Sequence, residues 1–161
     1  MASNRHLGRI VALQTLYELD FRVEVAEKNL DFDQVLDRNV SRYSQVVEDK
    51  QFVFDLVKGV RAEAESLDEF IQPLAPEWPL DQIARVDRTI LRMGVWEMRH
   101  SADSVPVRVV INEAVELAKS FGADNASKFV NGVLGTAARK LGLVKEETPT
   151  KETKAAKEKS T

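Results

Sequence analysis

Two arginines near the amino terminus have a spacing that suits the binding of nucleic acid. Arg5 and Arg9 are four residues apart, about one helical turn, so both guanidinium groups are expected on the same side of a helix. A guanidinium group binds phosphate oxygens through two parallel hydrogen bonds, which suits it to a phosphate backbone. Taken alone, however, two arginines at a helix start are more simply interpreted as ordinary surface charges.

Two aromatic residues are candidates for stacking on unpaired bases, because every base offers a flat face to an aromatic ring. Tyr17 shares a helical stripe with Ile10 and Leu13, so a tyrosine of the core is an equally good interpretation. Phe129 falls outside the apolar stripe of its own helix, which favours partial exposure. Lys128 beside it is a further candidate for contact with a phosphate.

Patterns typical of catalysis are absent from the sequence. The only histidines are His6 and His100, and neither lies in a nucleophile elbow or at a metal-ligand spacing. The chain has no cysteine, no phosphate-binding loop and no dinucleotide fingerprint. Its many carboxylates lie on amphipathic helices and are interpreted as solvated faces. We therefore expect a binding protein with no catalytic residues, no cofactor and no metal.

The charge distribution favours a local binding patch over a general nucleic-acid clamp. The chain has a formal net charge of −3 at pH 7, and residues 23–83 carry six basic and fourteen acidic side chains. The segments on either side of this acidic middle are mildly basic. Because long-range attraction to a polyanion needs a strongly basic surface, RNA binding through this chain is expected to need help from a partner.

Apolar residues recur at helical spacing through almost the whole chain, which predicts helices joined by short connections. The clearest pattern runs from Val53 to Leu74 and predicts one long helix, which Pro73, Pro76 and Pro79 end. The other helices are predicted around residues 10–21, 30–40, 83–98, 107–121 and 130–141.

Three local features have predicted roles within these helices. Asp31 or Asp33 is expected to cap the second helix. Gly122 is expected to end the helix before it in a left-handed conformation. Gly132 and Gly135 lie inside the last helix, where glycine costs stability, so they are expected to permit close approach of another helix.

The predicted fold class is all-α, because no alternating strand pattern occurs. We expect a helical bundle of about six to seven helices in two packed subdomains, formed by residues 1–144 around the first helix. Residues 145–161 have no apolar periodicity and are predicted to be a disordered charged tail. No apolar run approaches the roughly 20 residues needed to cross a bilayer, and no signal segment opens the chain, which predicts a cytoplasmic protein without a membrane partner.

Three stretches, in this order along the chain, carry a resemblance to a known family. They are RHLGRIVALQTLY at residues 5–17, RVDRTILRMGVWE at residues 85–97, and a third that begins at Val105-Pro106, continues as INEAVELAKSFG at 111–122 and ends as KFVNGVL at 128–134. Together they closely resemble the NusB family of bacterial transcription antitermination factors, over about residues 5–142. The acidic middle is the least similar part.

The resemblance implies a two-subdomain helical bundle without a cofactor. It also implies a partnership with NusE, a protein of the small ribosomal subunit, to bind boxA-type single-stranded RNA in ribosomal-RNA leaders. Such a complex modifies elongating RNA polymerase so that it passes terminators. On the matched positions, the implied RNA-binding residues are Arg5, His6, Arg9, Gln14, Tyr17, Lys128 and Phe129, and the implied partner-binding residue is Asp87.

Three alternatives remain open at this point. Asp87 is equally interpreted as a charge on a helix surface, paired with Arg88 or Arg92. His6 and Leu7 occupy places where the family commonly has further basic residues, which keeps open a helical scaffold that binds protein but little RNA. A stand-alone relative of the amino-terminal domain of ribosomal-RNA methyltransferases is the third interpretation.

Overall fold

Helices make up all the regular structure of residues 3–144, which are the residues that the computed structural model describes. In chain order they are α1 (Ser3–Glu24), α2 (Phe32–Arg42), α3 (Lys50–Ala62), α4 (Ala64–Ile71), the 3-10 helices η1 (Gln72–Leu74) and η2 (Leu80–Gln82), α5 (Arg85–His100), α6 (Val107–Phe121) and α7 (Ala126–Lys140). The predicted all-α fold class is therefore confirmed. The predicted charged tail, 145–161, lies outside the described residues.

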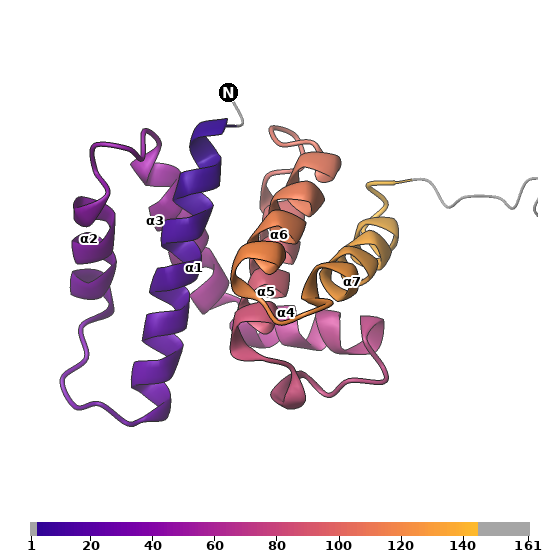
Figure 1. Cartoon of the computed structure of the whole chain (residues 1–161), viewed down its shortest axis with the longest axis horizontal. Coiled ribbons are helices and arrows are strands. Elements are labelled where there is room, and N and C mark those ends of the chain that lie inside the picture. Colours follow the sequence, from indigo (N-terminus) through magenta and orange to yellow (C-terminus); the bar gives the residue numbers. More distant parts are fainter. Residues whose placement is uncertain (1–2, 145–161) are drawn as a thin grey trace, which may run out of the picture.

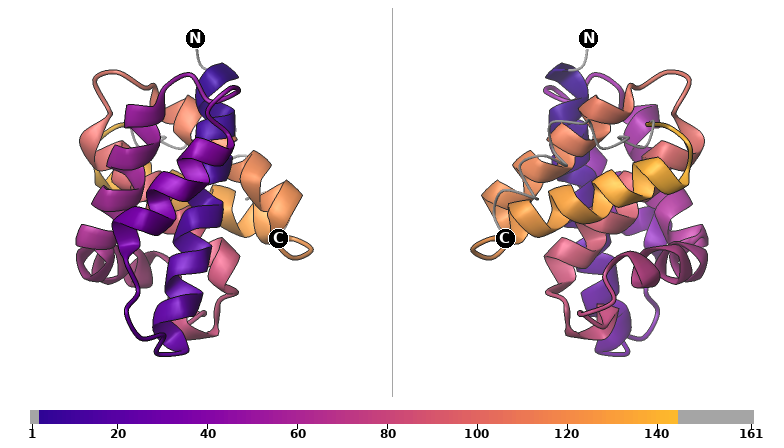
Figure 2. Two further views of the ribbon diagram at one scale, coloured as in Figure 1. Left: turned by 90° about the vertical axis from the view of Figure 1, so that its left-hand side faces the viewer. Right: turned by 90° about the vertical axis from the view of Figure 1, so that its right-hand side faces the viewer.

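The helices form two groups that meet along α1 and α5 (Figure 1). In that view α1, α2 and α3 lie on one side, and α4 to α7 lie on the other. α5 packs against α1, α3, α4, α6 and α7, so it lies at the centre, where the sequence had suggested α1. Its residues Ile90, Leu91 and Val95 are fully buried. Figure 2 shows α7 crossing the side of the molecule away from α2, at a steep angle to α1.

The apolar pattern of residues 53–74 forms two helices, so the prediction of one long helix is wrong. α3 and α4 meet at Glu63, whose backbone is not helical (φ −106°, ψ 11°). The Trp96 indole of α5 lies so close to Gly59 that a Cβ there would come within 2.2 Å of the ring, and its Nε1 donates a hydrogen bond to Glu63 Oε2 at 2.9 Å. The spacing continues across the break because both helices bury their apolar faces in one core.

Close helix approach occurs at Gly94 and not at Gly132 or Gly135, where the sequence suggested it. A Cβ on Gly94 of α5 would come within 2.9 Å of the Leu134 side chain of α7. A Cβ on Gly132 would meet nothing within 4 Å, and one on Gly135 would meet only the Arg139 Nη1 at 3.7 Å. These two glycines therefore face outward from α7.

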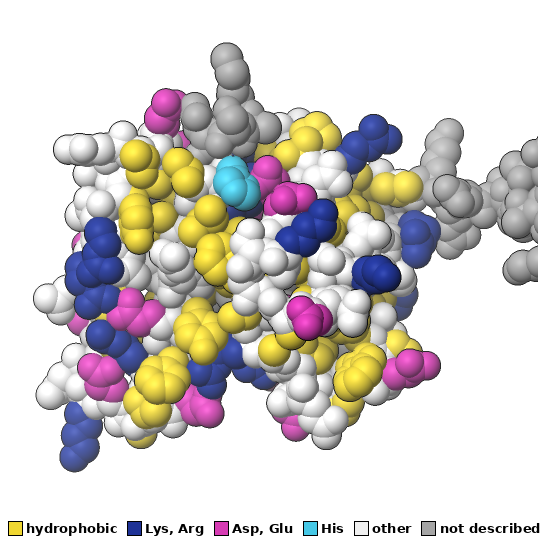
Figure 3. Space-filling view, in the orientation of Figure 1, with side chains coloured by type: hydrophobic (Ala, Val, Ile, Leu, Met, Phe, Trp, Pro, Cys, Tyr) yellow, Lys and Arg dark blue, Asp and Glu magenta, His cyan; other side chains and the backbone are white. Residues whose placement is uncertain are grey.

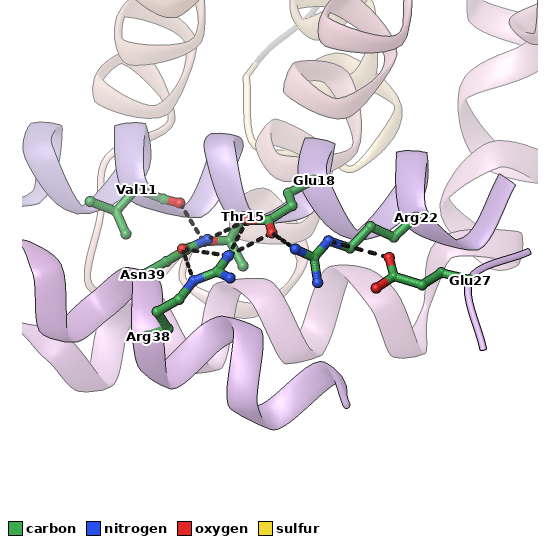
Figure 4. A network of polar contacts seen from close by, with 7 residues as sticks. All are labelled: Val11, Thr15, Glu18, Arg22, Glu27, Arg38 and Asn39. Carbon is green, nitrogen blue, oxygen red and sulfur yellow. Dashed lines mark hydrogen bonds and ion pairs between the residues drawn. The ribbon is translucent and has the colours of Figure 1, made fainter. Parts of the chain in front are cut away.

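A polar network fixes α2 against α1 (Figure 4). The buried Asn39 donates hydrogen bonds to Thr15 Oγ1 at 3.0 Å and to Glu18 Oε1 at 3.2 Å, while Arg38 donates to Glu18 Oε1 at 2.7 Å. Burial alone would raise the pKa of the Glu18 carboxyl, but the hydrogen bonds from Arg38 and Asn39 lower it. Asp31 caps α2, one of the two predicted caps, by accepting a hydrogen bond from the backbone N–H three residues later.

Candidate nucleic-acid interface

Arg5 and His6 lie half-buried at the amino-terminal end of α1. Arg5 contacts the start of α3, and His6 contacts α6. The Arg5 guanidinium lies 4.6 Å from the centroid of the Phe52 ring and is paired with Asp49 of the α3 start at 3.3 Å. The Nδ1 of His6 lies 2.6 Å from Glu113 Oε2 of α6. Both contacts are open to solvent, so either side chain can exchange its carboxylate for a phosphate at modest cost.

Arg9 is buried, so the expectation that it lies exposed beside Arg5 is wrong. It is 2% exposed, and its Nε and Nη2 donate hydrogen bonds to Glu97 of α5 at 2.9 and 2.7 Å. The two arginines do lie on the same side of α1. At Arg9, one turn further along the helix, this side packs against α3 and α5. A buried guanidinium needs a carboxylate partner, which Glu97 supplies while being 3% exposed itself. Arg9 therefore fixes α1 on α5 and does not present its charge to a ligand.

The outer face of α1 carries an apolar row that no described element covers. Leu7, Tyr17 and Phe21 are 40%, 41% and 50% exposed, and Gln14 lies exposed between them at helical spacing. Figure 3 shows hydrophobic side chains running down the molecule over α1. The Arg85 guanidinium of α5 borders this row, 5.7 Å from the Tyr17 ring centroid and 5.8 Å from that of Phe21. Tyr17 is thus a surface residue, and its interpretation as a core tyrosine is wrong.

Lys128 and Phe129 lie in the first turn of α7. Lys128 is exposed. Phe129 is partly exposed, as its position off the apolar stripe predicted, and the rest of its ring packs against the core. His6 contacts α6 at Glu113. The end of α6 at Phe121 lies about 12 Å from Glu113 along the α6 axis, and α7 begins only after that end. The predicted RNA-binding residues therefore occupy two separate areas and not one compact patch.

Asp87 is buried in the first turn of α5, so its interpretation as a surface charge is wrong. It is 6% exposed, and its Oδ1 has no hydrogen-bond partner within residues 3–144. Burial raises the pKa of this carboxyl. Arg92, one of the two proposed partners, pairs with Asp68 at 2.6 Å, and Arg88 donates to a backbone carbonyl at 3.4 Å.

Gly122 is required by the position of Asp87. A Cβ on Gly122 would lie 2.5 Å from Asp87 Oδ1 and 2.7 Å from a backbone carbonyl of α6. Its backbone is extended (φ −86°, ψ 175°), so the predicted left-handed cap is wrong. The end of α6 and the start of α5 are therefore in close contact around one carboxylate.

Glu97 is the buried partner of Arg9 that the sequence analysis missed. It lies seven residues after Ile90, on the apolar stripe of α5, where an acidic residue is expected to need a buried cation. That signal was present in the sequence, but it could not identify Arg9 as the cation. Within residues 3–144, no group of three or more acidic or histidine side chains is arranged to hold a metal ion, and no helix is long and apolar enough to cross a bilayer.

Comparison with known proteins decides the family. The model of the NusB family matches residues 6–139. The chain belongs to the NusB family. The transcription antitermination protein NusB of Chloroflexus aggregans is 44% identical over 137 residues, which cover 84% of this chain and 87% of that protein. NusB of Dehalococcoides mccartyi strain CBDB1 is 40% identical over 141 residues, covering 88% and 94%.

Solved NusB structures have the same fold. NusB of T. maritima superposes with a TM-score of 0.73 at 27% identity, covering 84% of this chain and 90% of that one. A chain from a crystal structure of the antitermination factors NusB and NusE in complex with double-stranded RNA superposes with a TM-score of 0.72 at 25% identity, covering 87% and 99%. The NusB fold thus accounts for nearly all of the described residues.

Proposed function

We propose that this protein is a transcription antitermination factor and not an enzyme. It binds boxA-type single-stranded RNA in ribosomal-RNA leaders together with a NusE-type ribosomal protein, and the complex acts on elongating RNA polymerase in the cytoplasm. Membership of the NusB family supports this function, as do relatives that are themselves antitermination proteins. The observation that carries it is that α1 has two different exposed surfaces. One is formed by the half-exposed Arg5 and His6 at its amino-terminal end, and the other is the uncovered apolar row along its side.

In this proposal the amino-terminal end of α1 binds RNA. Arg5 contacts the phosphate backbone directly and His6 lies next to it. Gln14 contacts the RNA further along α1, from the outer row that it shares with Tyr17, and Lys128 with Phe129 forms a second contact area on α7. Arg9 contributes indirectly, because its pairing with Glu97 holds α1 in place. With one guanidinium fewer on the surface than the sequence suggested, the chain alone is expected to bind RNA weakly.

The apolar row of α1 suits the protein partner. Tyr17 and Phe21 offer aromatic surface next to the Arg85 guanidinium, a composition enriched at protein interfaces. Tyr17 is also the residue proposed to stack on a base, and a partner on this face would bring RNA and protein together at its ring. Asp87 lies in the first turn of α5 and is 6% exposed, so in this proposal it acts on partner binding indirectly, by fixing the start of α5 against the end of α6.

The test is a titration of boxA-type RNA into the protein, into the NusE-type partner and into their mixture, at several salt concentrations. The mixture should bind more tightly than either component. Replacement of Arg5 by Ala should reduce the slope of log affinity against log salt by about 0.7, the value for one phosphate contact with a single strand. The matched control is Arg42→Ala, an exposed arginine in the last turn of α2, which should leave the slope unchanged.

A protein-binding scaffold with little RNA affinity is the second candidate function. The burial of Arg9 favours it, because few basic groups then remain on the surface at the end of α1. Under this alternative the mixture binds RNA no more tightly than the partner alone, and Arg5→Ala changes nothing. Tyr17→Ala would still weaken binding of the partner.

A further inference from the structure

A cleft of about 340 Å³ opens where the starts of α1 and α3 meet the end of α5. Its walls include Trp96 and His100 of α5, Phe52 and Asp55 of α3, Arg5 of α1, and Ser104 of the α5–α6 connection. This volume is within the range of sites that bind small organic groups. The cleft shares Arg5 with the candidate RNA-binding end of α1, but its other residues have no role in the function proposed above.

Two rings in the cleft are held in fixed orientations by one carboxylate. The centroids of Trp96 and His100 are 4.7 Å apart, with 34° between the ring planes. Glu63 accepts a hydrogen bond from Trp96 Nε1 at 2.9 Å, and its Oε2 lies 2.6 Å from His100 Nε2. The indole is fixed further by its contact with Gly59. An aromatic ligand stacking here would lose little free energy to ordering of the protein, because the rings are already in place.

The charged groups that line the cleft are the Arg5 guanidinium and the carboxylates of Asp49 and Asp55. Arg5 pairs with Asp49, whose other oxygen caps α3 by accepting from the Phe52 backbone N–H at 3.0 Å. Asp55 is exposed and accepts a hydrogen bond from Gln51 at 2.7 Å, and its two carboxylate oxygens have capacity for another donor. A carboxylate accepts hydrogen bonds from base amino groups and repels phosphate, whereas Arg5 attracts phosphate.

We propose that this cleft binds one unpaired nucleobase that carries an amino group, from an RNA strand whose phosphate lies at Arg5. The base stacks against the Trp96 and His100 pair, and its amino group donates to Asp55. This inference rests on the proposed RNA-binding function and adds a base subsite to it. A basic side chain of a protein partner would also suit the rings and the two carboxylates of the cleft. The nucleotide is favoured because the cleft is continuous with Arg5, at the end of α1 that binds RNA in the proposed function.

Tryptophan fluorescence reports directly on this subsite. The chain has two tryptophans, and Trp78 is exposed in the connection before α5, whereas Trp96 lies 11 residues after the first residue of that helix, about 17 Å along its axis. In the Trp78→Phe variant, Trp96 is the sole tryptophan. Titration with the boxA-type RNA should quench its emission. An RNA with one abasic site at the position whose base enters the cleft should bind about 5- to 100-fold more weakly and should no longer quench the Trp96 emission.

A charge substitution separates the subsite from general electrostatics. Replacement of Asp55 by Asn removes a negative charge, so unspecific electrostatics predicts tighter RNA binding. The subsite predicts several-fold weaker binding of RNA with an amino-bearing base at the responsible position, and no weakening when that base is uracil. Asp81→Asn is the matched control, an exposed carboxylate in η2.

Each outcome decides between the proposals. Quenching that the abasic site abolishes, with weaker binding of Asp55→Asn, supports the subsite. RNA binding that leaves Trp96 emission unchanged, or that Asp55→Asn strengthens as Asp81→Asn does, overturns the subsite and leaves the proposed function intact. Quenching by the NusE-type partner without RNA means that the cleft takes a protein side chain, which also overturns it. Failure of the wild-type protein to bind RNA, alone or with the partner, overturns both.

Discussion

The buried pair of Arg9 and Glu97 is expected to be a major determinant of stability, and a substitution cycle can measure it. The two side chains are 2% and 3% exposed and share two hydrogen bonds of 2.9 and 2.7 Å. The perturbation is Arg9→Met, which keeps an apolar stem of similar length and removes the guanidinium. Glu97 is then left as a buried carboxylate without its partner. The substitution also removes the longer contact of Arg9 Nη1 with Glu113, at 4.0 Å.

The expected loss follows from this burial. Removing one member of a buried ion pair costs about 3–5 kcal/mol of unfolding free energy, because the remaining charge is neither solvated nor paired. For a domain of this size about 1 kcal/mol corresponds to 2–4 °C, so the thermal midpoint should fall by roughly 6–20 °C. The double variant Arg9→Met with Glu97→Met removes both charges and should recover most of that loss, since the apolar replacement needs no partner.

Urea denaturation followed by far-ultraviolet circular dichroism measures each free energy of unfolding. The matched control is Arg5→Ala, one turn away on α1, whose ion pair with Asp49 is a third or more exposed. It should change stability by about 1 kcal/mol or less, because solvent screens exposed pairs. If Arg9→Met and Arg5→Ala have the same small effect, or if the double variant is no more stable than Arg9→Met, the buried-pair reasoning is wrong.

Three further predictions concern other parts of the described chain and its end. Gly132→Ala should raise the free energy of unfolding by about 0.5–1 kcal/mol, because a Cβ there meets nothing within 4 Å. Gly59→Ala should lower the free energy of unfolding, because the Trp96 ring would lie 2.2 Å from the added Cβ. Urea denaturation of both variants checks this. Asp87→Asn should stabilise the protein at neutral pH. Burial raises the folded-state pKa of this carboxyl, so its ionised form destabilises the fold. The stability gained by Asp87→Asn should therefore disappear as the pH falls below the unfolded-state pKa of the carboxyl. Thermal melting across pH checks this, and an equal gain in thermal midpoint at every pH would contradict the cause. A chain ending at Val144 should keep its thermal midpoint within about 3 °C, because residues 145–161 offer no apolar stripe for packing, and a larger fall in a melting experiment would mean that this segment docks on the bundle.

Several features of this protein were determined by the sequence alone, because they depend on local physical chemistry. The apolar period specifies which residues prefer a helix, so the helical fold class, the connection at Pro73–Pro79 and a cap at Asp31 or Asp33 followed from residues close together in the chain. The order and spacing of three motifs were enough to suggest the NusB family. Neither inference required knowledge of which helix lies against which.

The tertiary structure decided everything that depends on a neighbour distant in the chain. Arg9 has the right type and spacing for a surface phosphate contact, yet Glu97, 88 residues later, makes it an interior residue. The long pattern of residues 53–74 is broken at Glu63 because Trp96 of α5 lies there, and Gly122 is required because Asp87 approaches it. Helical periodicity reports which face of a helix is apolar, but the partner of each polar group on that face depends on how the helices pack.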